Sequence, residues 1–367
     1  MQLTIDRRAL LTAAKRASRA VATRPMKPIL ENLLLTVEAD HVLVTGTNLE
    51  VGIQTRIGIS PDCIDATGPA CRSCLLSRRL IGLLEADASD KVILTWSEQG
   101  VVVRTDDTSF TEGTVPPGEF PSVVSRPTEG VVWSTDTPEL AAGVRRVLFA
   151  ADAGTRWTTD AVCFSKGLNG GPALIATNGR TLACQEIEGE PPEAMALVPV
   201  AAASHVVQLF GGAVRIEATE STVFFSDDDT RIAARLCEGR FPKWQNYIPA
   251  KQREGTKVAA GTLLAHARRI AAAESDRGDG YTPSIKFTIT KDAIKMALER
   301  SLTQAETEIP VTSEHTGEAL FFPSTLLPAL TALRPETVVA VSLEGNMLLL
   351  STDDGWRAII MKTVYKD

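Results

Sequence analysis

Two patterns in this chain contain residue types that could do metal or redox chemistry. The first is the pair Cys71 and Cys74, which has the CxxC spacing of a zinc or redox site. A structural zinc site needs a second pair of ligands, but the other cysteines and all four histidines are scattered singly along the chain. Structural or incidental thiols are therefore the favoured interpretation, and neither a metal nor a cofactor is predicted.

The second pattern is a short acidic segment that occurs three times, at residues 105–108, 227–230 and 352–355. Each copy follows one apolar segment and precedes another, about a third of the chain apart. A run of aspartates could hold a metal ion, but Asp between two strands is also typical of a solvated hairpin turn. Three copies in register favour the turn.

Catalytic signatures are absent from the sequence. It contains no GxxxxGK[ST], no GxSxG, no HExxH and no GxGxxG after a strand. Catalytic residues can assemble from distant positions, so this observation lowers the expectation of an enzyme without removing it. We expect no catalytic residue.

Composition narrows the possible classes further. The chain has 367 residues, of which 44% are hydrophobic and 23% charged, and its net charge is −7. These values are ordinary for globular domains and exclude a uniformly basic nucleic-acid binder, but not a basic patch on an acidic body. The N-terminus lacks a signal-peptide core, and the uncharged stretch 194–214 reads as a strand and a helix, not a membrane span. We expect a cytoplasmic protein without membrane contact.

The chain repeats one order of elements three times. Each third begins with a strand and an amphipathic helix, at 4–20, 133–149 and 257–273, and continues with strands. A second helix follows, at 74–84, 201–210 and 324–333, and two strands close the unit around the acidic turn. Proline-rich or polar linkers at 121–127 and 249–255 separate the thirds. The prediction is an α+β chain of three repeated domains, 1–125, 126–252 and 253–367, each made of two strand–helix–strands halves.

Positive charge is concentrated on four predicted helices, at 7–20, 72–85, 137–149 and 260–274. Together they carry 12 basic residues against 3 acidic ones in a chain that is acidic overall. A solvated helix face explains one such helix, but four with the same bias favour a surface that faces nucleic-acid phosphates. Arg156 and Trp157 share a loop that either contacts nucleic acid or packs.

Several segments resemble the bacterial DNA polymerase III beta subunit, the beta sliding clamp family. The first domain carries RPMKPILENLLL at 24–35 and TGTNLE at 45–50. The middle region carries FP at 120–121, ATNGRTLA at 176–183 and GRFPKW at 239–244. The resemblance covers the whole chain and is weakest in the last third.

The resemblance implies a DNA clamp fold in which two chains form a head-to-tail homodimeric ring, with helices inside and sheets outside. It implies a processivity factor that encircles duplex DNA and tethers the polymerase III catalytic subunit, after a separate clamp loader opens the ring. The residues expected to bind DNA are Arg8, Lys15, Arg19, Arg24, Arg78, Arg145, Arg156, Trp157 and Arg268.

The family binds partner peptides in a pocket between its second and third domains. Matched positions here are Thr177, Gly179, Arg180, Leu182, Pro242, Asn246, Tyr247, Ile359, Ile360 and Met361. The tail keeps Met361 but lacks the family's following Pro, Met and Arg, and Tyr247 stands where a small aliphatic is common. These departures predict altered peptide specificity.

The family's dimer interface matches four positions, Phe110, Glu112, Ala272 and Ala273. Glu112 replaces a usual apolar residue, and the two alanines replace larger aliphatics, so a weak dimer is expected. The alternatives are a diverged paralogue with other partners or impaired ring formation, and an enzyme built on the same repeat.

Overall fold

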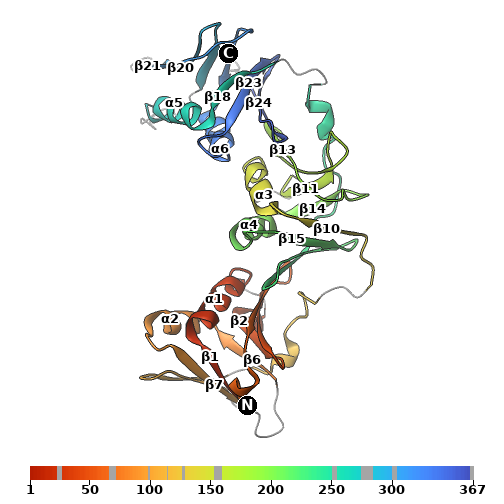
Figure 1. Ribbon diagram of the computed structural model, residues 1–367, viewed down its shortest axis with the longest axis vertical. Coiled ribbons are helices and arrows are strands. Elements are labelled where there is room, and N and C mark those ends of the chain that lie inside the picture. The colour runs from red at the N-terminus through yellow and green to blue at the C-terminus, as the bar shows by residue number, and fades with distance from the viewer. Residues whose placement is uncertain are drawn as a thin grey trace. The chain divides into compact units, whose positions relative to one another are not determined.

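The computed structural model describes residues 1–22, 27–65, 72–97, 100–113, 115–125, 129–152, 159–249, 254–273, 284–299 and 304–363. The chain divides into two compact units (Figure 1). One contains Met1–Pro138 and Gln208–Leu236, and the other contains Glu139–Val207 and Cys237–Asp367. Each unit holds two antiparallel sheets.

The first unit contains a five-stranded sheet and the first eight-stranded sheet. The five-stranded sheet has the order β5 (Ile64–Asp65), β1 (Gln2–Asp6), β7 (Lys91–Ser97), β8 (Gly100–Arg104) and β9 (Ser109–Glu112). The first eight-stranded sheet has the order β10 (Trp133–Thr137), β15 (Val214–Ala218), β16 (Thr222–Ser226), β17 (Thr230–Arg235), β4 (Val51–Gly58), β3 (His41–Thr47), β2 (Asn32–Val37) and β6 (Ser73–Ser77).

The second unit contains the second eight-stranded sheet and a four-stranded sheet. The eight-stranded sheet has the order β14 (Ala196–Pro199), β11 (Ala161–Lys166), β12 (Pro172–Thr177), β13 (Thr181–Glu186), β25 (Trp356–Met361), β24 (Met347–Ser351), β23 (Val338–Glu344) and β18 (Thr256–Ala259). The four-stranded sheet has the order β21 (Gln304–Pro310), β20 (Ala293–Glu299), β19 (Ile285–Ile289) and β22 (Gly317–Phe321).

Six α-helices lie within the described residues. They are α1 (Arg7–Ser18), α2 (Arg79–Ala86), α3 (Leu140–Leu148), α4 (Val200–Leu209), α5 (Ala260–Ala272) and α6 (Pro323–Thr331). Helix α1 lies beside α2, and α5 beside α6 (Figure 1). The cores between helices and sheets are mainly aliphatic, as the low aromatic content predicts.

Local sequence explains how α1 begins and which face it buries. The Asp6 carboxylate accepts a hydrogen bond from the Ala9 N–H at 2.7 Å, which caps the first turn. Leu10, Ala14 and Ala17 follow at helical spacing and are buried against the sheet. The charged residues between them are left on the other side of the helix.

The structure confirms the three acidic turns as hairpin turns. Residues 105–108 join β8 to β9, residues 227–230 join β16 to β17, and residues 352–355 join β24 to β25. The Asp227 carboxylate accepts from the N–H groups of Asp229 and Thr230, at 3.0 and 2.7 Å. This carboxylate is therefore satisfied by its own turn.

One expected helix is wrong in its first part. The sequence pattern predicts a helix from residue 72, but residues 73–77 form β6 and pair with β2, and α2 begins only at Arg79. Three consecutive residues of β6, Cys74, Leu75 and Leu76, are buried. A short apolar run of this kind fits a strand and a helix equally well, and the pairing with β2 decides.

The uncharged stretch 194–214 is a strand and a helix, β14 and α4, as the sequence predicts. No helix within the described residues combines the length and the apolar character needed to span a membrane.

Candidate nucleic-acid surface, sheet junctions and peptide cleft

The first helix of each third carries a basic pair at the same place. In α1, α3 and α5 a buried residue, Ala14, Val144 or Ala267, is followed directly by two cations. The pairs are Lys15 with Arg16, Arg145 with Arg146, and Arg268 with Arg269. The first cation of each pair is exposed. Three equivalent helices therefore expose a cation to solvent directly after a residue that is buried against the sheet.

Other expected DNA-binding residues lie on the same helices. Arg8 and Arg19 are exposed on and just after α1, and Arg78 is exposed at the start of α2. The Lys15 ammonium lies 2.6 Å from the Glu85 carboxylate on α2, an exposed ion pair that is worth little in water. Arg19 donates to the Gln208 side chain. Arg24, Arg156 and Trp157 lie outside the described residues.

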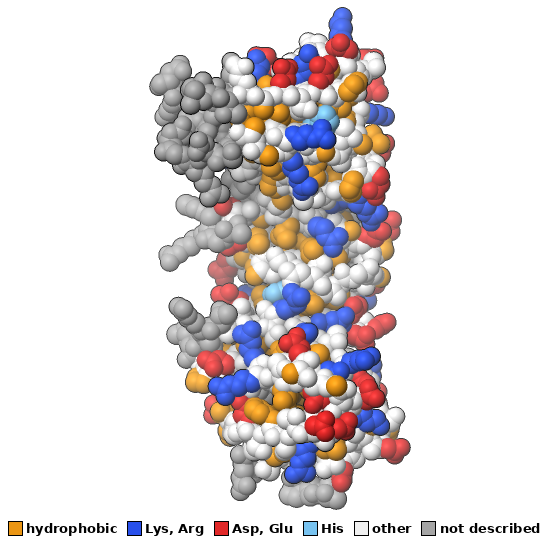
Figure 2. Space-filling model, turned by 90° about the vertical axis from the view of Figure 1, so that its left-hand side faces the viewer, with side chains coloured by type: hydrophobic (Ala, Val, Ile, Leu, Met, Phe, Trp, Pro, Cys, Tyr) orange, Lys and Arg blue, Asp and Glu red, His pale blue; other side chains and the backbone are white. Residues whose placement is uncertain are grey.

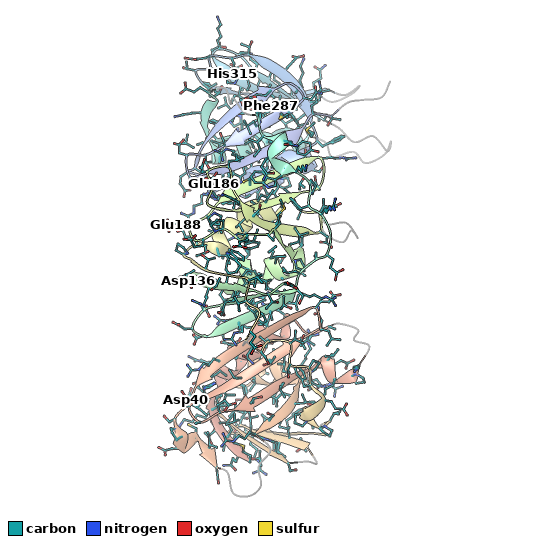
Figure 3. All side chains as sticks on the ribbon, turned by 90° about the vertical axis from the view of Figure 1, so that its right-hand side faces the viewer. Asp40, Asp136, Glu186, Glu188, Phe287 and His315 are labelled. Carbon is teal, nitrogen blue, oxygen red and sulfur yellow. The ribbon has the colours of Figure 1, made fainter. Side chains whose placement is uncertain are left out.

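Figure 2 shows one face of each unit with side chains coloured by charge. In each unit, Lys and Arg side chains are spread over the middle of this face, whereas Asp and Glu are more numerous along its right-hand edge. Acidic residues on or beside strands are labelled in Figure 3, with Asp40 and Asp136 in the first unit and Glu186 in the second. This distribution fits a chain that is acidic overall yet basic on its helices.

Arg7 does not belong to this surface, although the sequence pattern groups it with the basic helix residues. Its side chain is buried, and its guanidinium donates to the carbonyl oxygens of Ser89 and Leu84, both at 2.6 Å. It therefore satisfies carbonyl groups around the end of α2, which is a structural task.

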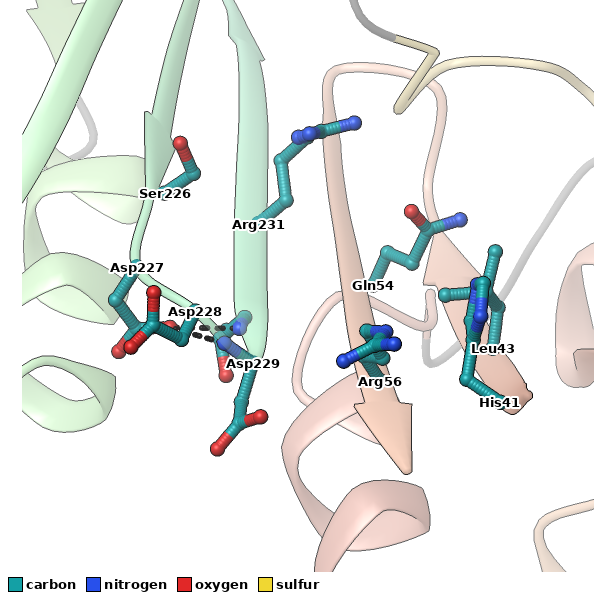
Figure 4. A pocket seen from close by; sticks show the side chains of 10 residues that line it. His41, Leu43, Gln54, Arg56, Ser226, Asp227, Asp228, Asp229 and Arg231 are labelled. Carbon is teal, nitrogen blue, oxygen red and sulfur yellow. Dashed lines mark hydrogen bonds between the residues drawn. The ribbon is translucent and has the colours of Figure 1, made fainter. Parts of the chain in front are cut away.

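Strand pairing joins the first and second thirds of the sequence. In the first eight-stranded sheet, β17 pairs with β4, with Arg231 opposite Gln54 and Ile232 opposite Ile53. We call this pairing the first junction. A polar hollow of about 220 Å³ lies beside it, between the Asp227–Asp229 turn and the side chains of Arg56 and His41 (Figure 4).

The second junction repeats the first one between the middle and last thirds. Here β25 pairs with β13, with Arg357 opposite Cys184 and Ala358 opposite Ala183. The two hairpins make Arg357 the equivalent of Arg231 and Ala358 the equivalent of Ile232. The same strands therefore meet in the same register at both junctions.

At both junctions the second cation of the helix pair reaches the neighbouring repeat. Arg16 donates to the Thr230 hydroxyl at 3.2 Å, at the first junction. Arg146 donates to the Asp354 carboxylate at 2.5 Å, at the second junction. Burial opposes ionisation of Asp354, but hydrogen bonds from Thr352 and Arg146 hold its pKa below the ordinary value.

A mainly apolar cleft of about 130 Å³ lies beside the second junction. Its lining residues are Thr159, Thr177, Gly179, Arg180, Thr181, Leu182, Pro242, Tyr247, Ile359 and Met361. Tyr247 and Met361 are 58% and 40% exposed, which is unusual for large apolar side chains. Such a cleft fits an extended peptide with apolar anchors.

Most of the residues expected to bind a partner peptide meet in this cleft, but two do not line it. Ile360 is fully buried on the core side of β25, and Asn246 lies outside the lining. Sequence reasoning missed Thr159 and Thr181. Thr181 follows directly on the matched Arg180, but nothing near Thr159 in the sequence marks it.

The cleft wall depends on a tight turn between β12 and β13. The Asn178 side chain accepts from the N–H groups of Arg180 and Thr181, and Gly179 has φ +80°. The equivalent turn in the first third places Leu49 at φ +79°, with its side chain 51% exposed. A Cβ at Gly179 would meet no atom within 4 Å, so glycine is required here by the positive φ and not by crowding.

The thiols do not form a metal centre within the described residues. Burial raises the pKa values of Cys163 and Cys184 to about 12, so both stay protonated at neutral pH. Cys74 is buried in β6, and Cys71 lies outside the described residues. No group of three potential metal ligands is found where the structure is described.

Comparison with known proteins agrees with this architecture over the whole chain. Residues 1–124 match the family model of the DNA polymerase III beta subunit, N-terminal domain. The beta sliding clamps of Pseudomonas aeruginosa and Haemophilus influenzae are 26% and 25% identical, and the alignments cover 94% and 91% of this chain and of each relative. Over nearly its whole length, the chain is similar to bacterial beta sliding clamps.

Solved clamp structures share the fold. The sliding clamp of P. aeruginosa superposes with a TM-score of 0.84 at 22% identity, and the beta subunit from Borrelia burgdorferi with 0.87 at 17%. Both comparisons cover 100% of each chain. The chain thus shares the clamp fold with these proteins although most residues differ.

Proposed function

We propose that this chain is a DNA sliding clamp, a non-catalytic processivity factor whose ring surrounds duplex DNA. The observation that carries the proposal is the basic pair repeated on α1, α3 and α5 of an acidic chain, whose first members are all exposed. Cations at equivalent places on three repeats suit a partner that is uniformly charged along its length. They do not suit a single small ligand.

The two sheets that are not shared between repeats supply the edge strands that a ring needs. Strand β9 ends the five-stranded sheet, and β21 ends the four-stranded sheet. By position in their repeats, β9 corresponds to β17 and β25, and β21 corresponds to β4 and β13. We propose that β9 of one copy pairs with β21 of another, which closes a head-to-tail homodimer with two identical intermolecular junctions.

The register of this third junction follows from the two internal ones. Ser109 is the equivalent of Arg231 and Arg357, and Glu306 is the equivalent of Gln54 and Cys184. Ser109 then lies opposite Glu306 of the partner subunit. Phe110 lies opposite Ala305 of the partner subunit, on the helix side of the sheet.

Burial supports this pairing. The apolar pairs at the internal junctions, Ile232 with Ile53 and Ala358 with Ala183, are completely buried. Their counterparts Phe110 and Ala305 are only partly buried in the single chain. A partner strand would cover them as the internal strands cover their equivalents.

Three further features belong to the proposal. The three sequence repeats 1–125, 126–252 and 253–367 are its domains, although the compact units follow the shared sheets. The cleft beside Tyr247 takes a peptide from the polymerase III catalytic subunit or from the clamp loader. The protein works in the cytoplasm, on DNA.

Primer extension with the polymerase III catalytic subunit of the same genome tests this function. Under single-encounter conditions the wild-type clamp should lengthen the products several-fold on a primed circle. A clamp with Leu182→Ala and Met361→Ala, which removes two apolar side chains from the cleft lining, should lose that effect. Products of unchanged length with the wild-type clamp would reject the proposed partner.

A further inference from the structure

The third cation pair contains an arginine, Arg269, for which the described residues offer no hydrogen-bond or ion-pair partner. Arg269 is exposed on α5, and it makes no ion pair and no side-chain hydrogen bond within the described residues. Its equivalents Arg16 and Arg146 both contact the neighbouring repeat. Among the described residues, Arg269 therefore lacks the inter-repeat contact that its two equivalents make.

The other two repeats indicate where Arg269 should make its contact. Helix α1 packs on β4, α3 on β13, and α5 on β21. In each internal case the arginine reaches across that strand to the hairpin turn of the next repeat, at Thr230 or Asp354. For α5, the next hairpin turn belongs to the β9 that pairs with β21.

That turn is the acidic segment Thr105–Thr108. Asp106 and Asp107 lie in it, both are exposed, and neither carboxylate makes a contact within the described residues. Thr108, the equivalent of Thr230, is exposed although Thr230 is 2% exposed. The turn is thus uncovered in the single chain in the same way as Arg269.

We propose that Arg269 forms an intermolecular ion pair with the Asp106–Asp107 turn of the partner subunit and so helps to hold the ring closed. This inference rests on the proposed head-to-tail dimer and names the charged contact at its junctions. Guanidinium–carboxylate pairs are among the stronger polar contacts, especially where a neighbouring strand and helix exclude water. The ring contains this contact twice, once at each intermolecular junction.

Dimer dissociation constants of the full chain, measured by sedimentation equilibrium, test the proposal. Arg269→Gln should raise the constant about tenfold, because a charged hydrogen bond is removed at each junction. The turn variant Asp106→Asn/Asp107→Asn should raise it similarly. Combining all three substitutions should add little to either effect, since each removes the same pair.

Matched controls keep the result specific. Lys286→Gln removes a cation from the four-stranded sheet away from β21, and Asp228→Asn/Asp229→Asn removes the same acids from an internal turn; both should dimerise as the wild type does. Each variant should keep its far-ultraviolet circular dichroism spectrum and thermal midpoint, because every changed side chain is exposed.

Three results would overturn the inference. If Arg269→Gln has the wild-type dissociation constant, the ion pair is rejected. The same holds if the effects of Arg269→Gln and of the turn variant on the dissociation constant multiply when they are combined. Neither result would reject the dimer. A wild-type chain that stays monomeric at every concentration would reject the ring itself, and the ion pair with it.

Discussion

The Arg146 guanidinium lies 2.5 Å from the Asp354 carboxylate, although 208 positions separate the two residues in the chain. The contact crosses the second junction, where strands of the middle and last thirds share a sheet. The Trp356 indole N–H also donates to the Arg146 carbonyl oxygen, at 2.9 Å. One helix position therefore fixes the neighbouring hairpin through both its side chain and its backbone.

Replacing the acid of this contact should weaken the fold in a pH-dependent way. Because the folded-state pKa of Asp354 is below its ordinary value of 3.8, its contribution is complete above that pH and disappears as the pH falls through the folded-state pKa. Asp354→Asn should cost about 1 kcal/mol or less at pH 7, since the side chain is 52% exposed.

Urea unfolding at pH 7 and at pH 3 checks this expectation. The difference between wild type and variant should shrink at the lower pH, with Asp353→Asn as a control that changes little at either. A difference that grows on acidification would mean that the carboxylate is not stabilised in its ionised form.

Neutralising the exposed cations of the three repeats should weaken DNA binding without unfolding the clamp. Lys15→Gln, Arg145→Gln and Arg268→Gln together should reduce the slope of log affinity against log salt by about one unit for each phosphate that is no longer neutralised. The control pair Lys91→Gln and Lys257→Gln lies on strands and should leave the slope unchanged. A wild-type slope in the triple variant would show that these helix cations do not neutralise DNA phosphates.

Changing Glu112 to leucine should tighten the dimer. The equivalents of Glu112 at the internal junctions are Ala234 and Ile360, both fully buried. Burying a leucine side chain is worth about 1.5–3 kcal/mol, so Glu112→Leu should lower the dissociation constant at least about tenfold. Thr111→Leu, on the other face of β9, is the control; equal effects of the two changes would show that the register is different.

Removing the ring of Tyr247 should widen the peptide cleft. This side chain is 58% exposed and lines the cleft beside Met361. Tyr247→Ala should therefore increase the affinity for a standard bacterial clamp-binding peptide in a fluorescence-polarisation titration. Met195→Ala, an exposed residue outside the cleft, should not. Weaker binding of the peptide to Tyr247→Ala would instead show that the aromatic side chain of Tyr247 contacts the peptide directly.

Sequence alone predicts the repeated features well. The acidic turns mark three hairpins because Asp at a turn satisfies its own backbone, as Asp227 does. The strand–helix character of the uncharged stretch 194–214 is also correct, because β14 and α4 lie there. Eight of the ten cleft residues follow from matched motifs, because motif spacing carries over with the fold.

Features that depend on contacts between distant parts of the chain could not be predicted from the sequence. Residues 73–77 form a strand because β2 lies beside them, which no local pattern states. Arg7 is indistinguishable from Arg8 in sequence, yet it is buried because carbonyl groups of Leu84 and Ser89 lie within its reach. Arg145 and Arg146 likewise differ because only Arg146 faces the next repeat, where it donates to Asp354, whereas Arg145 is exposed.

Covalent closure of the ring tests the central claim most directly. Ser109→Cys and Glu306→Cys face each other in the proposed register, so a short bismaleimide should join them across both intermolecular junctions. After assembly on nicked circular DNA, the cross-linked clamp should stay on the circle in SDS and leave it when the DNA is linearised. A Ser109→Cys/Glu318→Cys clamp, with its second thiol on the far edge of the four-stranded sheet, should not be retained. Release of the Ser109→Cys/Glu306→Cys clamp from intact circles in SDS, despite complete cross-linking, would contradict a ring that encloses DNA.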